Sequence, residues 1–480
     1  MQGVVSVIPS AMEYQNSLAI VSPKSISKEI DSSTITRNDF PDGFLFGTST
    51  SAYQVEGSAA KDGRRKIDDR SNGNVAADMY SKYKEDIIAM KNMGFDAYRF
   101  SICWTRILPG GHRNLGVNRE GIKFYSDLID MIIANGMEPF VTVFHFDLPQ
   151  VLQAEYGGFL SKKVVKDFCD YAEVCFWEFG DRVKYWILIN EPWTYAVNGY
   201  VMGTFPPGQA SAPAPVIANN IHAYRGAPHP ELIKNETKLY TSFKASGNPG
   251  QDVYTVGRNL LLAHAAAAQS YRTKFQAMQK GKIGISLNCN WYEPYSDSVE
   301  DTAASKRAVD FMIGWFLSPL LTGKYPQTMI DNVQDNLAPF TDKESDMLKG
   351  SLDFLGLNYY TAMYARDDPK HPEDEQSYMK DMHLETLRVD EENKLCLTSL
   401  EACVDPVRIQ YHQDHLAYLL KAMKNLDNPV DVHLEDMALK STANEAMLGT
   451  GLPNEGIPSD IDVGQPIFGQ NPHGDSGMYF

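Results

Sequence analysis

The sequence predicts an α/β fold of the (β/α)8 TIM-barrel type, incomplete towards its C-terminal end. From Phe40 onwards, short apolar runs with strand character alternate with helical stretches, an order typical of a parallel sheet. Six such units follow one another, which is more than a small doubly wound domain needs. No G-x-G-x-x-G motif follows the first expected strand, and this disfavours a dinucleotide-binding fold.

Each expected strand is short, apolar and bounded by Gly, Pro or polar residues. In chain order the strands are expected over 43–57, 95–104, 137–149, 185–192, 282–294 and 351–364. Apolar residues at helical spacing predict helices over 76–94, 118–136, 161–181, 256–281 and around 301–318. An insert at about 203–250, rich in Pro, Ala, Gly and Asn, is typical of a loop.

Both ends of the chain lack this alternation. Residues 1–38 show no clear period and are expected to be a disordered lead, without the basic and apolar regions of a signal peptide. The barrel domain is expected over 39–425, with strand seven missing near 366–404. Helical periodicity returns over 405–425. Residues 426–480 are expected to form an irregular tail.

Composition excludes several classes of function. The 44 basic and 61 acidic residues give a net charge of −17, which argues against binding to nucleic acid or to anionic membranes. No apolar run approaches the roughly 18 residues of a spanning helix, so a cytoplasmic location is the default. Six scattered cysteines without a C-x-x-C pair predict reduced thiols and no zinc site.

Two further patterns receive ordinary interpretations. The sequon at Asn235 is treated as a chance match, and His412 and His415 are interpreted as the polar face of a helix rather than as metal ligands. Neither a metal nor an organic cofactor is expected.

Polar side chains end each of the six expected strands. In chain order they are Gln54 and Glu56, Arg99, His145 and Asp147, Asn190 and Glu191, Asn288, and Asn358, Tyr359 and Tyr360. Taken singly, Glu191 is explained as a structural or surface glutamate and His145 as a hydrogen-bonded histidine. Arg99 is explained as the partner of a buried carboxylate and Tyr360 as a core residue. Their recurrence at the carboxyl ends of successive strands, where barrels hold their sites, predicts a common site. Gln, His, Asn and Tyr supply directional hydrogen bonds that suit a polyhydroxylated ligand.

Five segments carry a resemblance to a known family. They are FPDGFLFGTSTSAYQVEG, DAYRFSICWTRILPGG, FVTVFHFDLPQVL, GDRVKYWILINEPW and DFLGLNYYTAMY. The chain resembles the family-1 glycoside hydrolases, the retaining β-glucosidases, and particularly their plant branch, over about 38–364 and again over 405–425. Its long insert without cysteines is similar to that of the plant alkaloid glucosidases (raucaffricine and strictosidine glucosidases). The resemblance implies a TIM barrel that hydrolyses O-β-glucosides of small molecules without a cofactor.

The resemblance also implies roles for the residues at the strand ends. Glu191 of the Asn-Glu-Pro motif would be the acid/base, which protonates the leaving oxygen and then acts as a base. The second carboxylate, the nucleophile, would be positioned by Arg99 and Tyr360. The glucose hydroxyls would be hydrogen-bonded by Gln54, His145 and Asn190.

That second carboxylate is not found in the sequence. A retaining mechanism needs it about 5–5.5 Å from the first, and the family carries it at the end of strand seven in a Thr-Glu-Asn-Gly motif. No glutamate after Tyr364 ends a β-branched apolar run; these glutamates are Glu373, Glu375, Glu385, Glu391, Glu392, Glu401, Glu435, Glu445 and Glu455.

Three further departures from the family accompany this loss. The Trp-rich segment that ends its eighth strand is missing, because all six tryptophans lie at or before Trp315. The family's Pro-Ser-Ile-Trp-Asp loop is missing as well. Phe146 stands where the family usually carries Trp.

The missing carboxylate leaves three hypotheses for the reaction. A carboxylate from 365–404 could replace the nucleophile in an active β-glucosidase. Alternatively, hydrolysis is lost or severely impaired, and the chain binds glucosides or forms homo- or hetero-oligomers with family members, since six of eight strands leave two sheet edges unpaired. An inverting hydrolase using Glu191 and water is the third hypothesis, but no base at the wider separation is found. The second hypothesis is preferred.

Overall fold

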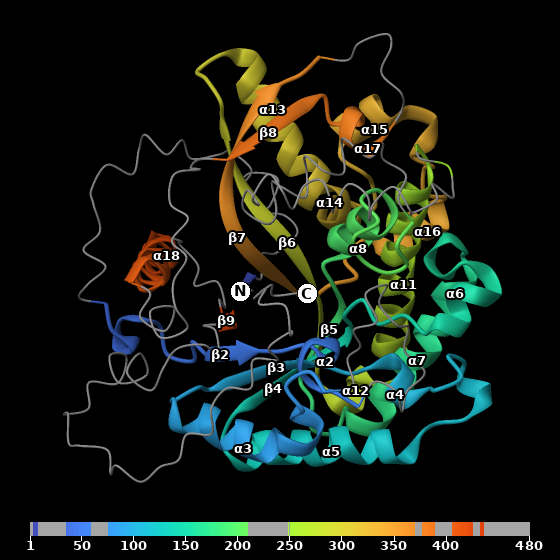
Figure 1. The fold of residues 1–480 in the computed structure, drawn as a ribbon, viewed down its shortest axis with the longest axis vertical. Coiled ribbons are helices and arrows are strands. Elements are labelled where there is room, and N and C mark those ends of the chain that lie inside the picture. The colour runs from blue at the N-terminus through green and yellow to red at the C-terminus, as the bar shows by residue number, and fades with distance from the viewer. Residues whose placement is uncertain are drawn as a thin grey trace, which may run out of the picture. The chain divides into compact units, whose positions relative to one another are not determined.

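Six parallel strands, paired in chain order, form the curved sheet at the centre of the molecule (Figure 1). They are β2 (Phe46–Ser49), β3 (Ala97–Ser101), β4 (Glu138–Phe144), β5 (Tyr185–Asn190), β6 (Lys282–Pro294) and β7 (Phe354–Asp367). Each pairs in parallel with the next. The predicted succession of βα units is therefore confirmed.

The computed structural model describes part of the chain. The described residues are 3–7, 35–58, 75–209, 248, 250–369, 377–388, 406–425 and 433–435. Most of the predicted loop insert, including Asn235, lies outside them. Among the cysteines that the structure describes, Cys103, Cys169, Cys175 and Cys289 are not in disulfides. None of the helices in the described ranges combines the length and apolar character that a membrane crossing requires.

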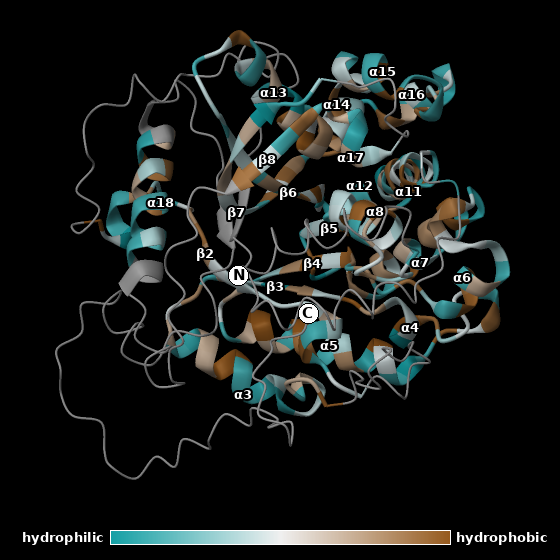
Figure 2. Ribbon diagram, turned by 45° about the horizontal axis from the view of Figure 1, so that its top comes forward, coloured by the Kyte–Doolittle hydropathy of each residue, from teal (hydrophilic) through white to brown (hydrophobic). Residues whose placement is uncertain are grey.

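Long helices return the chain between successive strands. They are α3 (Met79–Asn92), α5 (Arg119–Ala134), α7 (Lys163–Phe179), α11 (Asp252–Lys274), α13 (Val299–Val309) and α14 (Trp315–Thr322), which confirms the helices expected from periodicity. In α7, Phe168, Cys175 and Phe179 are fully buried, because helical spacing brings them to one face. In Figure 2, hydrophobic and hydrophilic residues alternate along α3 and α5, as expected of helices with one buried side.

Shorter helices occupy the connections. They are α2 (Ala52–Val55), α4 (Trp104–Ile107), α6 (Gln150–Tyr156), α8 (Pro192–Tyr200), α12 (Gln276–Gln279), α15 (Gln327–Val333), α16 (Asp342–Leu348) and α17 (Tyr378–Asp381). Short 3-10 turns are η3 (Arg37–Asp39), η5 (Arg113–Leu115), η6 (Gly158–Leu160) and η8 (Gln334–Asn336), and η7 (Asp310–Gly314) is a π-helical turn.

The first strand is shorter than the sequence predicts. A strand was expected over 43–57, but β2 ends at Ser49 and the chain turns into α2. Two bonds to the neighbouring strand cause the turn: Thr50 N–H donates to the Arg99 carbonyl (3.0 Å) and Ala52 N–H donates to Ser101 Oγ (2.7 Å). Gln54 therefore lies on a helix rather than on a strand.

Two short strands, one near the start of the chain and one after α18 (Pro406–Asn425), lie between β7 and β2. Strand β1 (Gly3–Val7) pairs antiparallel with β7 and with β9 (His433–Glu435), and β9 pairs in parallel with β2. These pairings occupy the two sheet edges that were expected to be unpaired, and residues 3–7 and 433–435 are strands where a disordered lead and an irregular tail were expected. The physical reason is that open edges of β2 and β7 present unpaired N–H and C=O groups, which extended segments satisfy.

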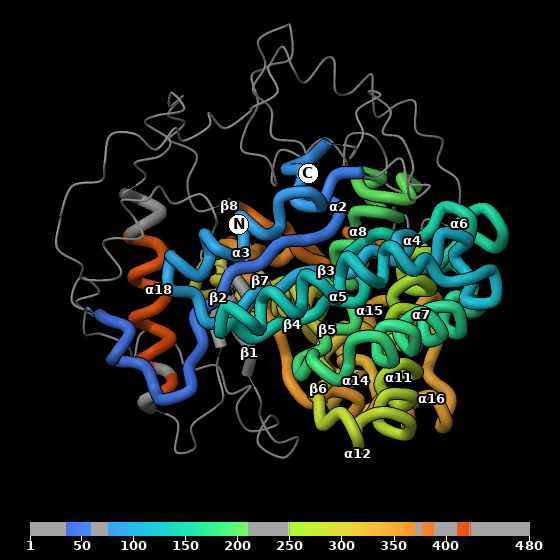
Figure 3. Tube along the Cα trace, turned by 90° about the horizontal axis from the view of Figure 1, so that it is seen from below, coloured from blue at the N-terminus to red at the C-terminus, as the bar shows by residue number. Residues whose placement is uncertain are grey.

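Helix α18 (Pro406–Asn425) confirms the helix expected over 405–425. Its Leu420 and Met423 form a separate apolar cluster with Phe40, just before β2. Figure 3 shows α18 beside the segment that leads into β2. Its Tyr411 hydroxyl donates to the carbonyl of Tyr360 on β7 (3.1 Å). In chain order α18 precedes β9, as the seventh helix of a (β/α)8 barrel precedes the eighth strand. Strand β9 therefore lies beside β2, where the eighth strand of such a barrel lies.

The described part of 366–404 contains no parallel seventh strand. Its one strand, β8 (Leu384–Arg388), runs antiparallel along the far end of β7, from Met363 to Asp367. Strands β6, β7 and β8 thus continue together beyond the rest of the sheet (Figure 1).

A buried ion pair anchors the start of the barrel. Arg106 Nε donates to Glu56 Oε2 (3.1 Å), and both side chains are 3% exposed. The Tyr125 hydroxyl donates to Glu56 Oε1 (2.7 Å), so both carboxylate oxygens are occupied. Glu56, one of the polar residues at the strand ends, thus has a structural role in joining α2, α4 and α5.

Replacing Glu56 with Gln should destabilise the protein by about 3–5 kcal/mol, because it leaves the buried Arg106 charge uncompensated. The measurement is the free energy of unfolding from urea titration. Glu385→Gln is the matched control, since Glu385 pairs with Arg366 in an exposed ion pair worth at most about 1 kcal/mol. Equal losses in the two variants would contradict the structural role assigned to Glu56.

Candidate active site

Glu191 lies where β5 ends and α8 begins. Its backbone adopts the left-handed conformation (φ 44°, ψ 63°), which is uncommon for a residue with a side chain. Its N–H donates to the carbonyl of Ser286 on β6 (2.7 Å), and Pro192 starts the helix. This sharp turn at the carboxyl end of the strand holds the Glu191 carboxyl group in the barrel interior, where the residue is 3% exposed.

Three neutral donors hold the Glu191 carboxylate. Oε1 accepts from Asn358 Nδ2 (2.6 Å) and from the Tyr360 hydroxyl (2.7 Å). Oε2 accepts from Thr194 Oγ1 (2.8 Å). These donors come from β7 and α8, so the orientation of the carboxylate is determined by two separate elements.

Arg99 and Asn358 orient the amide of Asn190. Arg99 Nη2 donates to Asn190 Oδ1 (2.6 Å), and Asn358 Nδ2 donates to the same oxygen (3.0 Å). Arg99 is 1% exposed, and its Nε also donates to Thr142 Oγ1 (2.9 Å). Because two donors meet at Oδ1, the Asn190 amide nitrogen must face the other way.

That nitrogen determines the tautomer of His145. Asn190 Nδ2 lies 3.1 Å from His145 Nε2, so the amide donates and Nε2 accepts. Burial, together with the charge of Arg99, lowers the pKa of His145 to about 3, so the ring is neutral and its proton is on Nδ1. Nδ1 is buried without a hydrogen-bond partner in the described structure. The Nδ1–H group of His145 can therefore donate a hydrogen bond to a ligand.

Asn288, Asp147 and Gln54, which were also expected at the strand ends, differ in their burial and in their hydrogen-bond partners. Asn288 on β6 is buried beside Asn358 in the sheet, and its Oδ1 has no partner within the described residues. Asp147 accepts from the backbone N–H of Trp104 (3.0 Å), which is a structural contact. Gln54 is exposed on α2, where its Oε1 accepts from Ser51 Oγ (2.7 Å). The described side-chain hydrogen bonds link Arg99, His145, Asn190, Glu191, Asn358 and Tyr360, and Gln54 lies outside this network.

Two threonines of this network were missed by sequence reasoning. Thr194, in the first turn of α8, donates a hydrogen bond to Glu191. Thr142, on β4, accepts a hydrogen bond from Arg99. A signal was present for each of them. Thr194 stands three residues after the candidate acid, and Thr142 interrupts an apolar strand between Val141 and Val143.

The place beside β7, where the family carries its nucleophile, is taken by β1. Val4 lies opposite Asn358, and β1 (Gly3–Val7) contains no carboxylate. Arg99 and Tyr360 were expected to position the nucleophile; in the structure Arg99 donates to Asn190 and Thr142, and Tyr360 donates to Glu191.

Two of the later glutamates lie in described strands. Glu385 is exposed and pairs with Arg366 on the distant part of β7. Glu435 of β9 holds a register position between Val4 and Gly47. The other seven glutamates after Tyr364 lie outside the described residues.

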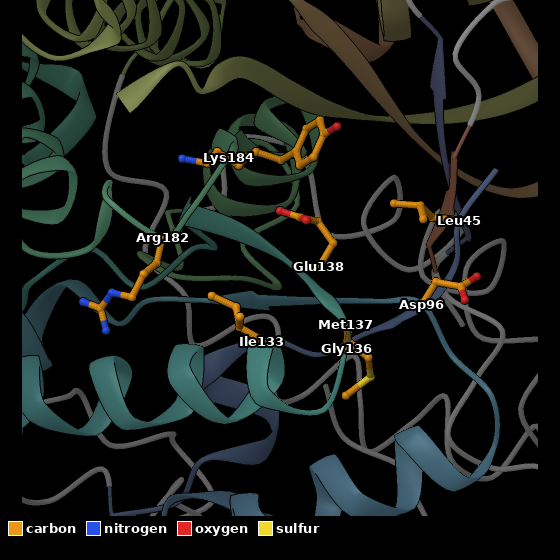
Figure 4. A pocket seen from close by; sticks show the side chains of 9 residues that line it. Leu45, Asp96, Ile133, Gly136, Met137, Glu138, Arg182 and Lys184 are labelled. Carbon is orange, nitrogen blue, oxygen red and sulfur yellow. The ribbon is translucent and has the colours of Figure 1, made fainter. Parts of the chain in front are cut away.

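A hollow of about 540 Å³ lies at the opposite end of the barrel (Figure 4). It is lined where β3, β4 and β5 begin, by residues that include Asp96, Glu138 and Lys184. Its basic groups are already engaged: Arg182 donates to Asp130 (2.7 Å), and Lys184 donates to the Gln279 carbonyl (3.0 Å). The hollow lies at the other end of the strands from Glu191, and both of its basic groups have partners.

Comparison with known proteins agrees with this geometry. Residues 36–396 match the family described as glycosyl hydrolase family 1. The chain belongs to this family. It is 44% identical over 447 residues to the oleuropein β-glucosidase of Olea europaea, covering 81% of this chain and 80% of the other.

Two further family-1 proteins resemble this chain in sequence and in structure. Raucaffricine-O-β-D-glucosidase of Rauvolfia serpentina is 47% identical over 377 residues, covering 74% of this chain and 67% of that enzyme. The crystal structure of the rice Os3BGlu6 β-glucosidase superposes with a TM-score of 0.73 at 36% identity, covering 84% of this chain and 90% of the rice chain. The TIM-barrel fold implied by the sequence is thereby confirmed.

His145 should make the stability of this family-1 protein depend on pH. Its pKa is about 3 when folded and 6.5 as a model value, so between these pH values the unfolded chain binds a proton that the folded chain does not. Stability should therefore fall as the pH drops below 6.5, by about 2 kcal/mol at pH 5 from this group alone.

The test is urea unfolding of the wild type and His145→Gln at pH 7.5 and pH 5. We expect the variant to lose about 2 kcal/mol less than the wild type between the two pH values. His264, whose pKa burial lowers to about 4, is present in both proteins, so its contribution cancels. Parallel pH dependence in the two proteins would contradict a neutral, buried His145.

Proposed function

We propose that this chain binds O-β-glucosides of plant secondary metabolites at the Glu191 network, and that it has lost, or nearly lost, their hydrolysis. In this proposal Glu191 is the family's acid/base, and no glutamate takes the place of its nucleophile. The observation that carries the binding part is a set of buried polar atoms around Glu191 without partners.

The unpartnered atoms support a ligand rich in hydroxyl groups. His145 Nδ1 is a donor and Asn288 Oδ1 is an acceptor, and both are buried. An unsatisfied buried polar group costs about 1–3 kcal/mol, and a sugar hydroxyl can donate to one such group and accept from another. Glucose hydroxyls in this space would remove that cost, which favours binding.

The chemistry follows from the groups that are present. A protonated Glu191 can deliver its proton to the glycosidic oxygen, while Asn190, fixed by Arg99 and Asn358, can donate to a sugar hydroxyl beside it. The retaining mechanism also needs a carboxylate that attacks the anomeric carbon from the other side. Strand β1 supplies none where the family carries it, so the glycosyl-enzyme does not form by the family's route.

The substrate class comes from the relatives. Those named above are a β-glucosidase of oleuropein and one of raucaffricine, and a further relative, 48% identical, is the cyanogenic β-glucosidase of Trifolium repens. These names support a plant secondary-metabolite glucoside as the ligand, alkaloid glucosides included.

The second candidate role is association with intact family members. The observation in its favour is β8, which ends the strand order and pairs only with β7 among the described strands. An open strand edge is a surface on which another chain can add a strand. Size-exclusion chromatography of the chain, alone and mixed with an intact plant β-glucosidase, tests this role; unchanged elution of both would exclude it.

Turnover of 4-nitrophenyl β-glucoside tests the proposed function. We expect the wild type to release nitrophenol no faster than Glu191→Gln, because the limiting defect is the missing nucleophile. Added azide should raise the rate of the wild type, since azide can attack the anomeric carbon in place of the carboxylate, and the product should be glucosyl azide. Circular dichroism verifies that both proteins are folded.

Either part of the proposal can fail separately. No turnover with azide would show that the sugar pocket is lost. Turnover well above that of Glu191→Gln without azide would show a replacement nucleophile. Trapping with a 2-deoxy-2-fluoro-β-glucoside, followed by peptide mapping, would then identify that residue, with Glu435 and the glutamates of 365–404 as the candidates.

A further inference from the structure

His112 lies in the connection between β3 and α5, and its imidazole ring contacts two other helices. Nδ1 lies 2.9 Å from Asp167 Oδ1 of α7, and Nε2 lies 2.9 Å from Glu155 Oε2 of α6. We propose that these three side chains, here called the His112 bridge, are a pH-dependent link that holds this connection to α6 and α7 only while the imidazole is protonated. The bridge needs neither hydrolysis nor a bound glucoside, so the inference does not rest on the proposed function.

The two carboxylates determine the protonation state that the bridge requires. A carboxylate only accepts hydrogen bonds, so each ring nitrogen of His112 must donate one. Only the imidazolium form carries an N–H group on both nitrogens. In the neutral ring one nitrogen would present its lone pair to a carboxylate oxygen, and one of the two hydrogen bonds would be lost.

Close packing brings the connection within reach of both helices. Gly111, which precedes His112, has a positive φ of 77°, and a Cβ atom there would lie 2.7 Å from Val151 of α6. The helices α4, α6 and α7 lie on the same side of the barrel (Figure 3). The backbone thus approaches α6 closely, and the imidazole reaches both carboxylates from this position.

The other titratable group at the bridge is Tyr156 of α6. Its hydroxyl donates to Asp167 Oδ2 (2.8 Å), while the second oxygen of that carboxylate faces His112. Burial raises the pKa of Tyr156, so this hydroxyl keeps its proton while the imidazole titrates.

The cations next in sequence to the bridge have partners of their own. Arg113 pairs with Glu173 of α7 (3.2 Å). Lys166, which precedes Asp167, pairs with Asp170 on the next turn of α7. The charge that binds both carboxylates of the bridge is therefore that of the imidazolium.

The contacts also give the direction of the pH dependence. The hydrogen bond to Glu155 raises the pKa of His112 above its usual 6.5, partial burial acts in the opposite direction, and the bond to Asp167 raises the pKa further. A raised pKa in the folded protein contributes stability that is complete below pH 6.5 and is lost as the pH rises through the folded value. The bridge is therefore formed in acid and is lost at alkaline pH.

The connection that the bridge holds also supports the candidate active site. Trp104 Nε1 donates to the carbonyl of Gly111 (3.0 Å), and the Trp104 N–H donates to Asp147 Oδ2 (3.0 Å). The other oxygen of Asp147 accepts from the N–H of His145 (3.2 Å). Loss of the bridge thus loosens the connection that packs beside the backbone of His145.

Urea unfolding at pH 6 and pH 8.5 tests the bridge in the wild type, His112→Gln and His112→Arg. Between the two pH values, the ratio of folded to unfolded wild type should fall about 2- to 5-fold more than that of His112→Gln, the range for a partly exposed ion pair. Groups that titrate elsewhere are present in all three proteins, so their contributions cancel. His112→Arg is the matched control, because a guanidinium can donate to both carboxylates and keeps its charge at both pH values.

Hydrogen exchange at pH 8.5 then locates the effect. The amide of Gly111, which donates to the Leu108 carbonyl (2.8 Å), should exchange about 2- to 5-fold faster in the wild type than in His112→Arg. Equal pH dependence of unfolding in the wild type and His112→Gln would overturn the inference. Equal exchange of Gly111 in the wild type and His112→Arg would overturn it as well, because protonation would then not control the connection.

Discussion

The candidate site depends on the hydrogen bonds of the Asn358 side-chain amide. One of its two N–H groups donates to Asn190 and the other to Glu191, and its oxygen faces Arg99 (3.4 Å). It thereby ties β3, β5 and β7 together at the level of the carboxylate. Both donors of a fully buried amide are used, which is the condition under which such a group can be buried without a large penalty.

The consequences extend through Asn190 to His145. Since Asn358 and Arg99 both donate to Asn190 Oδ1, the Asn190 amide must donate to His145, and the imidazole proton must then be on Nδ1. A chain of neutral and charged donors thus sets the direction of each hydrogen bond offered to a ligand. Preorganised dipoles of this kind cost little reorganisation when a polar ligand binds.

A second constraint is the pairing of every strand of the barrel. The five residues of β1 and the three residues of β9 lie between β7 and β2. Helix α18 packs against the residues just before β2. Backbone pairing can be satisfied by many extended segments, but a catalytic carboxylate requires a particular side chain at a particular position. This difference explains how short segments can pair with the edges of β7 and β2 while the family's Thr-Glu-Asn-Gly motif is absent from the sequence.

Much of the protein could be predicted from its sequence by itself. The alternation of apolar strands with helices of 3.6-residue period determined the order of the βα units. The polar residues at successive strand ends identified Arg99, His145, Asn190, Glu191 and Tyr360 as neighbours, because parallel strands bring their carboxyl ends to one rim. These are local patterns, and local patterns are what periodicity and turn residues encode.

The tertiary structure decided what depends on contacts between distant segments. It shortened the first strand through bonds to β3, moved Gln54 onto a helix, directed Tyr360 to Glu191 and recruited Thr142 and Thr194. It also paired residues 3–7 and 433–435 with the sheet. Residues 3–7 are rich in valine, which favours a strand, but no local pattern says with which strand either segment pairs. The edges of β7 and β2 offer the hydrogen bonds that decide it, and only the folded barrel creates these edges.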